Sequence, residues 1–413
     1  MSHAEAHRNL LEIFQAALRR VAGDVAVSDW LAAHPPSRDV ELIALGKAAQ
    51  SMARGAWEQQ GKGIRRVLLI SKTDHLDGRF CRERGWEGIE AAHPVPAQSS
   101  LQAGRRLVEF LDTGDQDLPL LVLISGGASS LVEVPVDGVD LAFLARTNHW
   151  LLGSSMDIVS MNRVRKGLSR IKGGGLLSWV GNREVILLAI SDVPGDLPGA
   201  IGSGLLVPEP DLQGRLGELR LPQWLSEALT TGLEQRRGQG LPTSGPELHI
   251  VANLEAAKLA ATSRAMALGY VARTVPGVLE GDAEAVGLRL AQELIEGPSG
   301  VTVWGGETTV KLPVQPGRGG RNQHLALAAA MALEGQTDCL MLCAGSDGSD
   351  GPTEDAGALV NGETLARARQ EGFDPKQYLA RADSGALLEA TGDLITTGPT
   401  GTNVMDLVIG LKL

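Results

Sequence analysis

The chain has 413 residues, of which 43% are hydrophobic and 21% charged, and its formal net charge is -11. A chain of this length is expected to form two domains, because one domain usually holds roughly 100–200 residues. The negative charge disfavours a nucleic acid or an acidic membrane as partner, since either would need a basic surface.

The cysteines and the first residues predict a cytoplasmic location. Cys81, Cys339 and Cys343 are too few and odd in number for a disulfide framework, and the last two lie in an apolar run typical of a core. The opening residues lack the cationic and apolar blocks of a signal peptide. No apolar run approaches the roughly 20 residues of a membrane helix, so we expect no membrane partner.

The first half of the chain alternates helices with apolar strands. An amphipathic helix comes first, since Leu10, Phe14 and Val21 recur at helical spacing after Ser2. Apolar runs typical of strands begin at Val40, Val67, Leu120 and Val185. These runs do not alternate with polar residues, as expected for parallel strands buried on both faces. The pattern predicts an α/β/α layered domain.

A polar segment rich in Arg, Gly and Pro, residues 230–246, predicts the boundary between two domains. We place the domains at residues 1–240 and 241–413, with the first helix free to pack on the second domain. Further apolar runs begin at Leu248, Tyr270, Val301, Thr308, Cys339 and Val404. Helical stretches lie between these runs, so the second domain is expected to be mixed α/β.

Polar, glycine-rich turns follow three strands of the first domain: ALGKAA, SGGASS and SDVPGD. The carboxyl ends of parallel strands meet at one edge of a sheet, so we expect these turns to converge on one site. SGGASS, residues 125–130, is typical of a phosphate cradle with exposed backbone amides, although an ordinary strand-to-helix turn would have the same residues.

A basic cluster stands out in this acidic chain. Its members are Arg163, Arg165, Lys166, Arg170 and Lys172. Helical spacing predicts that Arg163, Lys166 and Arg170 share one face of a helix. The glycines at 173–175 suit either a helix end or a close approach to phosphate, and a solvated basic face is the alternative.

Carboxylates in glycine-rich turns are candidate ligands for a divalent cation. Asp192 follows a predicted strand. Its carboxylate could bind Mg²⁺ or accept a proton from an attacking hydroxyl, and the alternative is that it only forms a turn. Asp347 and Asp350 lie in GSDGSDGPTEDAG, whose spacing does not match a calcium-binding EF-hand loop. The chain also lacks the P-loop, the protein-kinase motifs, a dinucleotide fingerprint after a strand, and the serine hydrolase elbow.

Taken in order, these segments resemble the class II glycerate kinases, the glycerate 2-kinases. The likeness is carried by ALGKAA, HPVP, SGGASS, NRVRKGLSRIKGGG, ISDVPGD, GGETTV, GRGGRNQ, GSDGSDGPTEDAG and TGPTGTNVMDL, from about Val40 to Leu411. The second half resembles the family's C-terminal domain, named for a leucine-rich multi-organism fragment (MOFRL). The resemblance implies a Rossmann-like N-terminal domain, a smaller mixed α/β domain, and an active site in the cleft between them.

The resemblance also implies a reaction: phosphorylation of the C2 hydroxyl of D-glycerate by ATP and Mg²⁺, giving 2-phosphoglycerate. Lys47, Arg321 and Asp192 are the implied catalytic residues, and Asp192, Asp347 and Asp350 the candidate metal ligands. Nucleotide contacts are expected from Ser125, Gly126, Gly127, Ser129, Ser130, Lys172, Gly173, Gly174, Gly306, Glu307 and Asn322. His324 departs from the family, whose members usually carry Glu there.

Two other functions remain open from the sequence. Relatives are sometimes labelled hydroxypyruvate reductases, which would make the chain an oxidoreductase, although the dinucleotide fingerprint is absent. A phosphate- or nucleotide-binding protein without turnover is the non-enzymatic alternative. A homodimer is left open alongside a monomer.

Overall fold

The computed structural model describes residues 2–154 and 156–413, which form two compact units. Unit 2 runs from Gly23 to Val251, and unit 1 holds the residues up to Ala22 together with Ala252–Leu413. The first helix, α1 (His3–Val21), therefore belongs to the unit that contains the C-terminus. The sequence placed the boundary after residue 240, before the last strand of unit 2.

Unit 2 is built on a six-stranded sheet in the order β3-β2-β1-β4-β5-β6, the order of the Rossmann fold. Its strands are β1 (Val40–Leu45), β2 (Ile64–Lys72), β3 (Glu87–Ala91), β4 (Leu120–Ile124), β5 (Val185–Ile190) and β6 (Leu248–Ala252). The pairs among β1 to β5 are parallel. This confirms the predicted Rossmann-like class, but β6, assigned from sequence to the second domain, completes this first sheet.

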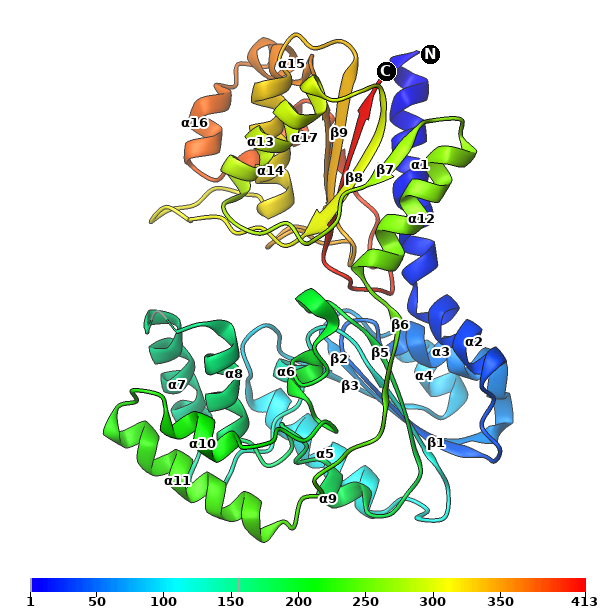
Figure 1. Ribbon diagram of the computed structural model, residues 1–413, viewed down its shortest axis with the longest axis vertical. Helices are drawn as coiled ribbons and strands as arrows, with labels where there is room; N and C mark the ends of the chain where they lie inside the picture. The colour runs from blue at the N-terminus through cyan, green and yellow to red at the C-terminus, as the bar shows by residue number, and fades with distance from the viewer. Residues whose placement is uncertain (1, 155) are drawn as a thin grey trace. The chain divides into compact units, whose positions relative to one another are not determined.

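Helices cover both faces of this sheet, which is why every residue of β1 and β4 is buried. The layers contain α2 (Gly23–Ala33), α3 (Ala49–Gln60), α4 (Gly78–Arg84), α5 (Gln98–Asp112), α6 (Ala128–Leu131) and α9 (Leu177–Val180). Figure 1 shows α3 on one face and α5 on the other. Strands buried on both sides explain the continuous apolar runs in the sequence.

A separate helical group extends from unit 2 beside α6 (Figure 1). It consists of α7 (Leu141–Gly153), α8 (Ile158–Gly167), α10 (Leu212–Gly217) and α11 (Gln223–Gly238). These helices share an apolar core that includes Leu144, Val164 and Leu229. Because α8 ends at Gly167, Arg170 lies beyond the helix, and the predicted face shared by Arg163, Lys166 and Arg170 is wrong.

Unit 1 has a mixed sheet in the order β11-β10-β9-β12-β8-β7. Its strands are β7 (Ala272–Thr274), β8 (Gly300–Gly306), β9 (Cys339–Gly345), β10 (Gly357–Asn361), β11 (Leu394–Ile395) and β12 (Asp406–Lys412). β12 pairs antiparallel with β8 and β9, whereas β7 and β8 are parallel. The strand predicted from Thr308 is wrong: the run forms one bridge at Thr309, and Leu312 and Val314 are exposed.

Two sets of helices cover the faces of this second sheet (Figure 1). One set is α1 and α12 (Leu254–Ala267); the other is α13 (Ala283–Glu296), α14 (Arg321–Leu333), α15 (Thr364–Gln370), α16 (Pro375–Ala380) and α17 (Ser384–Ala390). The apolar stripe of α1, with Leu10, Ile13 and Phe14, is buried, as predicted. Cys339 and Cys343 are also buried, as expected of core residues.

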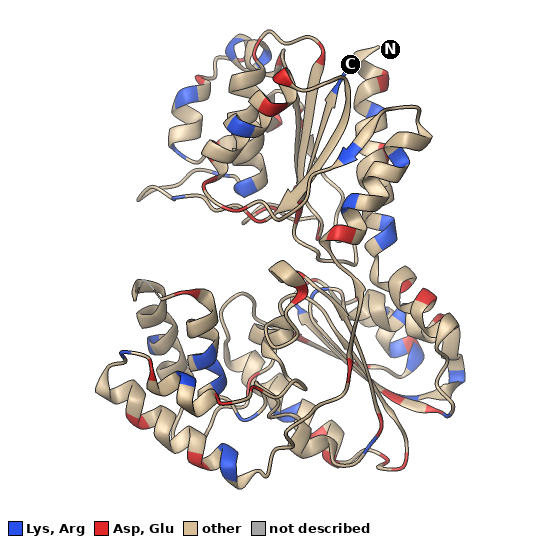
Figure 2. Cartoon of the chain, in the orientation of Figure 1, with Lys and Arg blue, Asp and Glu red and all other residues tan. Residues whose placement is uncertain are grey.

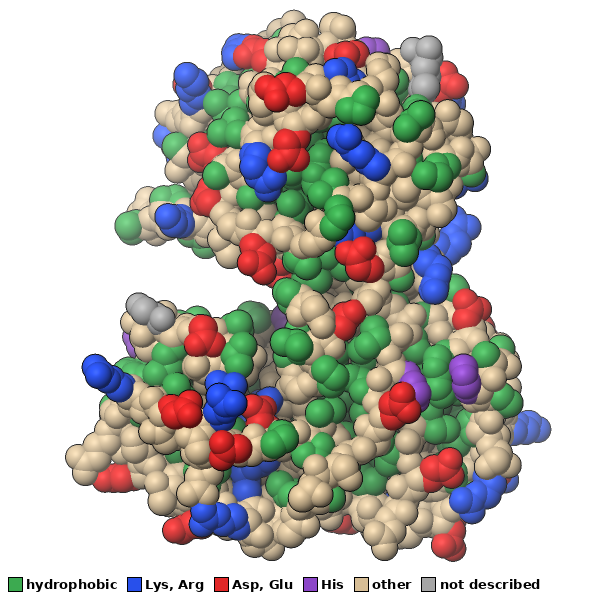
Figure 3. All heavy atoms as spheres, in the orientation of Figure 1, with side chains coloured by type: hydrophobic (Ala, Val, Ile, Leu, Met, Phe, Trp, Pro, Cys, Tyr) green, Lys and Arg blue, Asp and Glu red, His purple; other side chains and the backbone are tan. Residues whose placement is uncertain are grey.

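Figure 3 shows Lys and Arg side chains interspersed with Asp and Glu on the face that it presents, without one large basic patch. Among the described residues, no helix combines the length and the apolar character needed to cross a bilayer.

Candidate active site

The turns after β1 and β4 lie against each other at the carboxyl edge of the unit 2 sheet. The Lys47 amide donates to the Gly126 carbonyl at 2.9 Å, and the Ser125 amide donates to the Leu45 carbonyl at 2.8 Å. Ser125 Oγ accepts from the Ala48 amide at 3.0 Å. The strand order reverses direction between β1 and β4, and ligands of open α/β sheets bind in the crevice at such a point.

Two glycines allow this close approach. Gly46 has φ +118°, and a Cβ there would lie 2.3 Å from Ser125 Oγ. Gly127 has φ +86°, and a Cβ there would lie 3.0 Å from His93 Cδ2 and 3.5 Å from Lys47 Cγ. Only glycine fits both positions without displacing a neighbour. The Lys47 side chain and the His93 ring are thereby brought to the same glycine turn.

The glycine turn has the features of the predicted phosphate cradle. The amides of Gly126 and Gly127 donate to no protein acceptor within residues 2–154 and 156–413. The hydroxyls are engaged: Ser129 Oγ contacts Ser203 Oγ at 2.5 Å, and Ser130 Oγ donates to the Gly127 carbonyl at 3.0 Å. The backbone amides, more than the serine side chains, are therefore the groups with room for an anion.

A cavity of about 430 Å³ opens beside this turn, entirely within unit 2. Leu144 and Leu152 contribute apolar wall. The polar lining comes from His93, Gly127, Ser129, Ser130, Glu133, Thr147, Asn148, Asn162, Arg165, Lys172 and Ser203, and the Glu133 carboxylate is paired with Lys172. An apolar cavity with a few convergent polar groups is the usual form of a small-molecule site. Sequence reasoning missed His93, Thr147 and Asn148, and HPVP was the one signal that pointed to His93.

The polar groups of the KGGG segment already have partners within the protein, namely those of Lys172, Gly173 and Gly174. Lys172 Nζ forms a buried ion pair with Glu133, and Ser169 Oγ also donates to that carboxylate. The amide of Gly173 donates to the Ser203 carbonyl at 3.0 Å, and that of Gly174 to the Gly204 carbonyl at 2.7 Å. In this structure the glycines hold a loop in place, so the phosphate contacts expected from them lack free donors.

Only part of the basic cluster faces the cavity. Figure 2 shows Lys and Arg residues on α8. Arg163 and Lys166 both pair with Glu209, with Arg163 Nε 3.4 Å from the carboxylate. Arg165 instead lines the cavity. Lys172 lines the cavity too, but it is paired with Glu133, so Arg165 is the member of the cluster that brings an unpaired charge to the cavity.

Asp192 directly follows β5, which is the neighbour of β4. Since parallel strands end at the same edge, Asp192 lies at the edge that also carries Lys47 and Ser125. Its side chain is half-buried. The third predicted turn thus ends at the expected edge of the sheet.

In unit 1, Arg321 begins α14 and is held by two carboxylates. Its Nε and Nη2 donate to Asp406 at 2.6 and 3.1 Å, and its Nη1 donates to Glu307 at 2.5 Å. Burial by itself lowers the pKa of the guanidinium, but the hydrogen bonds and charges of Asp406 and Glu307 outweigh it and raise the pKa overall. Sequence reasoning missed Asp406, the first residue of β12.

The predicted metal ligand Asp350 caps the same helix. Its two oxygens accept from the amides of Asn322 at 3.0 Å and Gln323 at 2.8 Å, and the side chain of Asn322 also donates to it. Burial raises the pKa of Asp350 to about 7. A helix N-terminus is a favourable place for a carboxylate, so this geometry explains Asp350 without a metal.

The remaining predicted residues of unit 1 have local roles in the fold. Gly306 ends β8, where a Cβ would lie 2.2 Å from the Leu279 amide nitrogen. Asp347 accepts from the Ser349 amide at 3.0 Å. His324 is buried beside Ser384, and burial lowers the pKa of its imidazole. Among the described residues, no group of three His, Cys, Asp or Glu side chains is placed to hold a metal ion.

Comparisons with known proteins cover nearly the whole chain. Two family models match: a domain of unknown function, DUF4147, over residues 9–218, and the MOFRL family over residues 300–406. The D-glycerate 2-kinase of Thermotoga maritima is 36% identical, with 97% of each chain covered. The glycerate 2-kinase of Pyrococcus horikoshii is 34% identical, covering 90% of this chain and 87% of the relative. A putative hydroxypyruvate reductase of Agrobacterium vitis is also 34% identical, covering 97% and 93%.

Solved structures agree. A crystal structure of glycerate kinase from Thermotoga maritima matches with a TM-score of 0.84 and 34% identity, over 99% of this chain and all of that one (100%). A crystal structure of a Pyrococcus horikoshii protein matches with a TM-score of 0.76 and 32% identity, over 98% of both chains.

Proposed function

The chain belongs to the glycerate 2-kinase family, and we propose that it transfers the terminal phosphoryl group of ATP to the C2 hydroxyl of D-glycerate, in the cytoplasm and with Mg²⁺. The observation that carries the proposal is the contact between the Lys47 turn and the Ser125 turn, where strand order reverses. A lysine and free backbone amides at one sheet edge are the groups that a polyphosphate needs.

Phosphoryl transfer asks a protein for in-line positioning and for positive charge around the transferring oxygens. We propose that Lys47 neutralises the migrating phosphoryl group and that the amides of Gly126 and Gly127 contact phosphate oxygens. Both are brought together by the turn geometry of unit 2. Arg321 is proposed to add charge from unit 1, although its Nε edge is already bonded to Asp406.

Carboxylates at glycine turns fit Mg²⁺, which prefers oxygen ligands and retains several waters. Of the three candidates, we propose Asp192 as the main ligand and Asp347 as a second, because both oxygens of Asp350 serve the start of α14. The ion would neutralise charge on the nucleotide phosphates. Asp192 has a second proposed role, acceptance of the proton from the C2 hydroxyl.

The proposal predicts turnover with D-glycerate, ATP and Mg²⁺. The assay adds enolase and measures the phosphoenolpyruvate formed, and it omits the mutase that would interconvert 2- and 3-phosphoglycerate. Enolase converts only the 2-phosphate onward to phosphoenolpyruvate, so the signal reports both activity and the position of transfer. The control replaces these substrates with hydroxypyruvate and NADH, where no change in absorbance is expected. Oxidation of NADH without any phosphoenolpyruvate would favour the reductase instead.

Arg321→Lys is expected to lower kcat by about 10–100-fold. The variant keeps the charge but loses the planar fork that bonds Asp406, and hydrogen bonds to charged groups are each worth about 1.5–3 kcal/mol. The matched control is Arg318→Lys, an exposed neighbour in the same segment that pairs with Glu389. If Arg321→Lys has the wild-type kcat but a lower melting temperature, we would conclude that Arg321 contributes to stability and not to catalysis.

A further inference from the structure

Among the described residues Arg165 has no carboxylate partner, unlike Arg163 on the same helix. Its Nε donates to Asn148 Oδ1 at 3.1 Å and its Nη1 to Asn162 Oδ1 at 2.9 Å. These amide oxygens fix the plane of the guanidinium without neutralising its charge. Within the described part of the chain, no carboxylate lies within 4.0 Å of it, and burial lowers its pKa. Keeping a desolvated cation unpaired is costly.

The contrast with other arginines of unit 2 is direct. Arg163, two residues earlier on the same helix, pairs with Glu209. Arg66 and Arg183 pair with Glu41. Arg165 alone of these four lines the cavity beside the glycine turn. Its unpaired charge is therefore directed to the space where a small molecule would bind.

A second group in this cavity also lacks a partner. Thr147 is 2% exposed, lines the cavity from α7, and its Oγ1 has no hydrogen-bond partner in residues 2–154 and 156–413. A buried hydroxyl without a partner costs about 1–3 kcal/mol, so such groups are normally satisfied by water or a ligand. An arginine with an unpaired charge and an unsatisfied hydroxyl together suit a carboxylate, which accepts from both.

We infer that Arg165 binds the carboxylate of the hydroxy-acid substrate, with Thr147 as a second donor. The inference rests on the proposed kinase function and names the residue that distinguishes glycerate from a neutral polyol. The same cavity reaches Gly127, against which Lys47 packs, so one molecule in it lies near both the carboxylate donors and the phosphoryl-transfer turn. Arg321 is a weaker choice for this task, because Asp406 and Glu307 already bond its guanidinium.

Arg165→Gln is expected to lower kcat/KM for D-glycerate by roughly 100-fold, through KM, while KM for ATP changes less than about threefold. Activity on D-glyceramide, which has no negative charge, should fall much less, so the preference of the enzyme for the acid over the amide shrinks. Arg163→Gln removes a charge from the same helix outside the cavity and should keep wild-type constants. Melting temperatures of all variants are measured alongside.

The outcomes separate the inference from the function. If wild-type enzyme phosphorylates D-glycerate but Arg165→Gln raises KM for ATP instead, Arg165 binds nucleotide phosphate and the inference is wrong. Unchanged constants for both substrates overturn it as well. If Arg165→Gln does not fold, Arg165→Lys takes its place, with a loss of about 10-fold expected for D-glycerate alone. No phosphorylation by the wild-type enzyme would remove the proposed function, and the inference with it.

Discussion

Lys47→Ala is expected to lower kcat by about 10²–10³-fold, the usual cost of removing one preorganised group that stabilises transition-state charge. The expectation follows from the position of Lys47, whose amide is bonded to Gly126 and whose side chain packs against Gly127 at the reversal of strand order. The enolase-coupled assay measures kcat, and thermal unfolding measures stability, which should stay near wild type because the backbone contacts of the turn remain.

Lys62→Ala is the control for Lys47→Ala. Lys62 is exposed and also belongs to unit 2, so its loss changes net charge equally without touching the turn. Its kcat should match wild type. If Lys47→Ala retains most of the wild-type kcat, Lys47 has no part in the chemistry, and the proposed mechanism fails at its first step.

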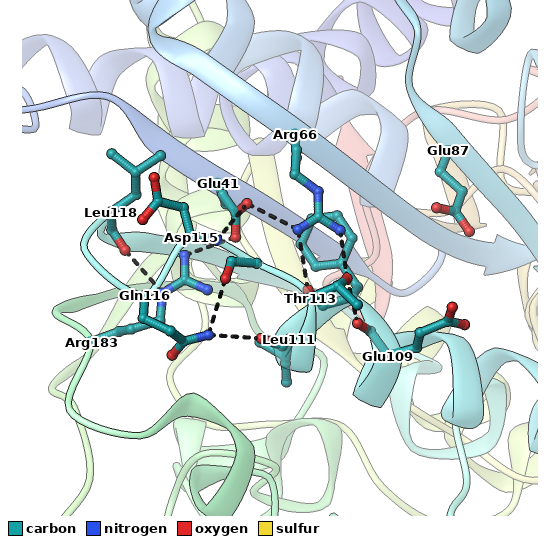
Figure 4. Close-up of polar contacts among 12 residues, drawn as sticks. Glu41, Arg66, Glu87, Glu109, Leu111, Thr113, Asp115, Gln116, Leu118 and Arg183 are labelled. Carbon is teal, nitrogen blue, oxygen red and sulfur yellow. Dashed lines mark hydrogen bonds and ion pairs between the residues drawn. The ribbon is translucent and has the colours of Figure 1, made fainter.

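Glu41→Ala is expected to destabilise unit 2 by about 3–5 kcal/mol. Glu41 is 1% exposed and accepts from Arg66 Nη1 at 3.1 Å and Arg183 Nη2 at 3.0 Å, as Figure 4 shows. The Arg183 side chain is also 1% exposed, and its remaining polar contact is the Leu118 carbonyl at 2.9 Å. Without Glu41, a buried guanidinium loses its counter-charge. Urea unfolding followed by circular dichroism measures the change in free energy.

Two further variants test this explanation. Glu184→Ala breaks an exposed pair with Arg38, at 4.0 Å, and should cost less than about 1 kcal/mol. The double replacement Glu41→Leu with Arg183→Met removes both buried charges and should regain much of the stability, since apolar groups of similar size replace buried ion pairs well. A double variant as unstable as Glu41→Ala would show that the loss comes from packing and not from the unpaired charge.

The fold class could be predicted because burial on both faces leaves a local trace. The runs from Leu120 and Val185 are apolar throughout, the run from Val40 is apolar apart from Glu41, and each forms a strand of the parallel sheet. The run from Thr308 failed because its apolar residues are solvent-exposed. The strand at Leu248 was found but assigned to the wrong sheet, since the sheet that a strand joins depends on distant pairing partners and not on its own composition.

For the candidate site, the convergence of the turns could be predicted, but the partners of each side chain could not. The rule that parallel strands end at one edge brought Lys47, Ser125 and Asp192 to the same edge of the sheet. What the sequence could not reveal is which cations are already neutralised. Glu133 lies 39 residues from Lys172 in the chain, and Asp406 lies 85 residues from Arg321. Only the folded structure pairs them, and it places Arg165 in the cavity with amide oxygens as its hydrogen-bond partners.

Because α1 belongs to unit 1, the two units are expected to complete their folding in a fixed order during translation. During translation α1 is made before any strand of its own unit, and its apolar stripe must wait for α12 and β12, on which it packs. Unit 2, continuous from Gly23 to Val251, can complete its sheet in the meantime. Unit 1 therefore completes its folding last. A fragment that begins at Ala252 would lack α1, and one face of its sheet would lose a covering helix.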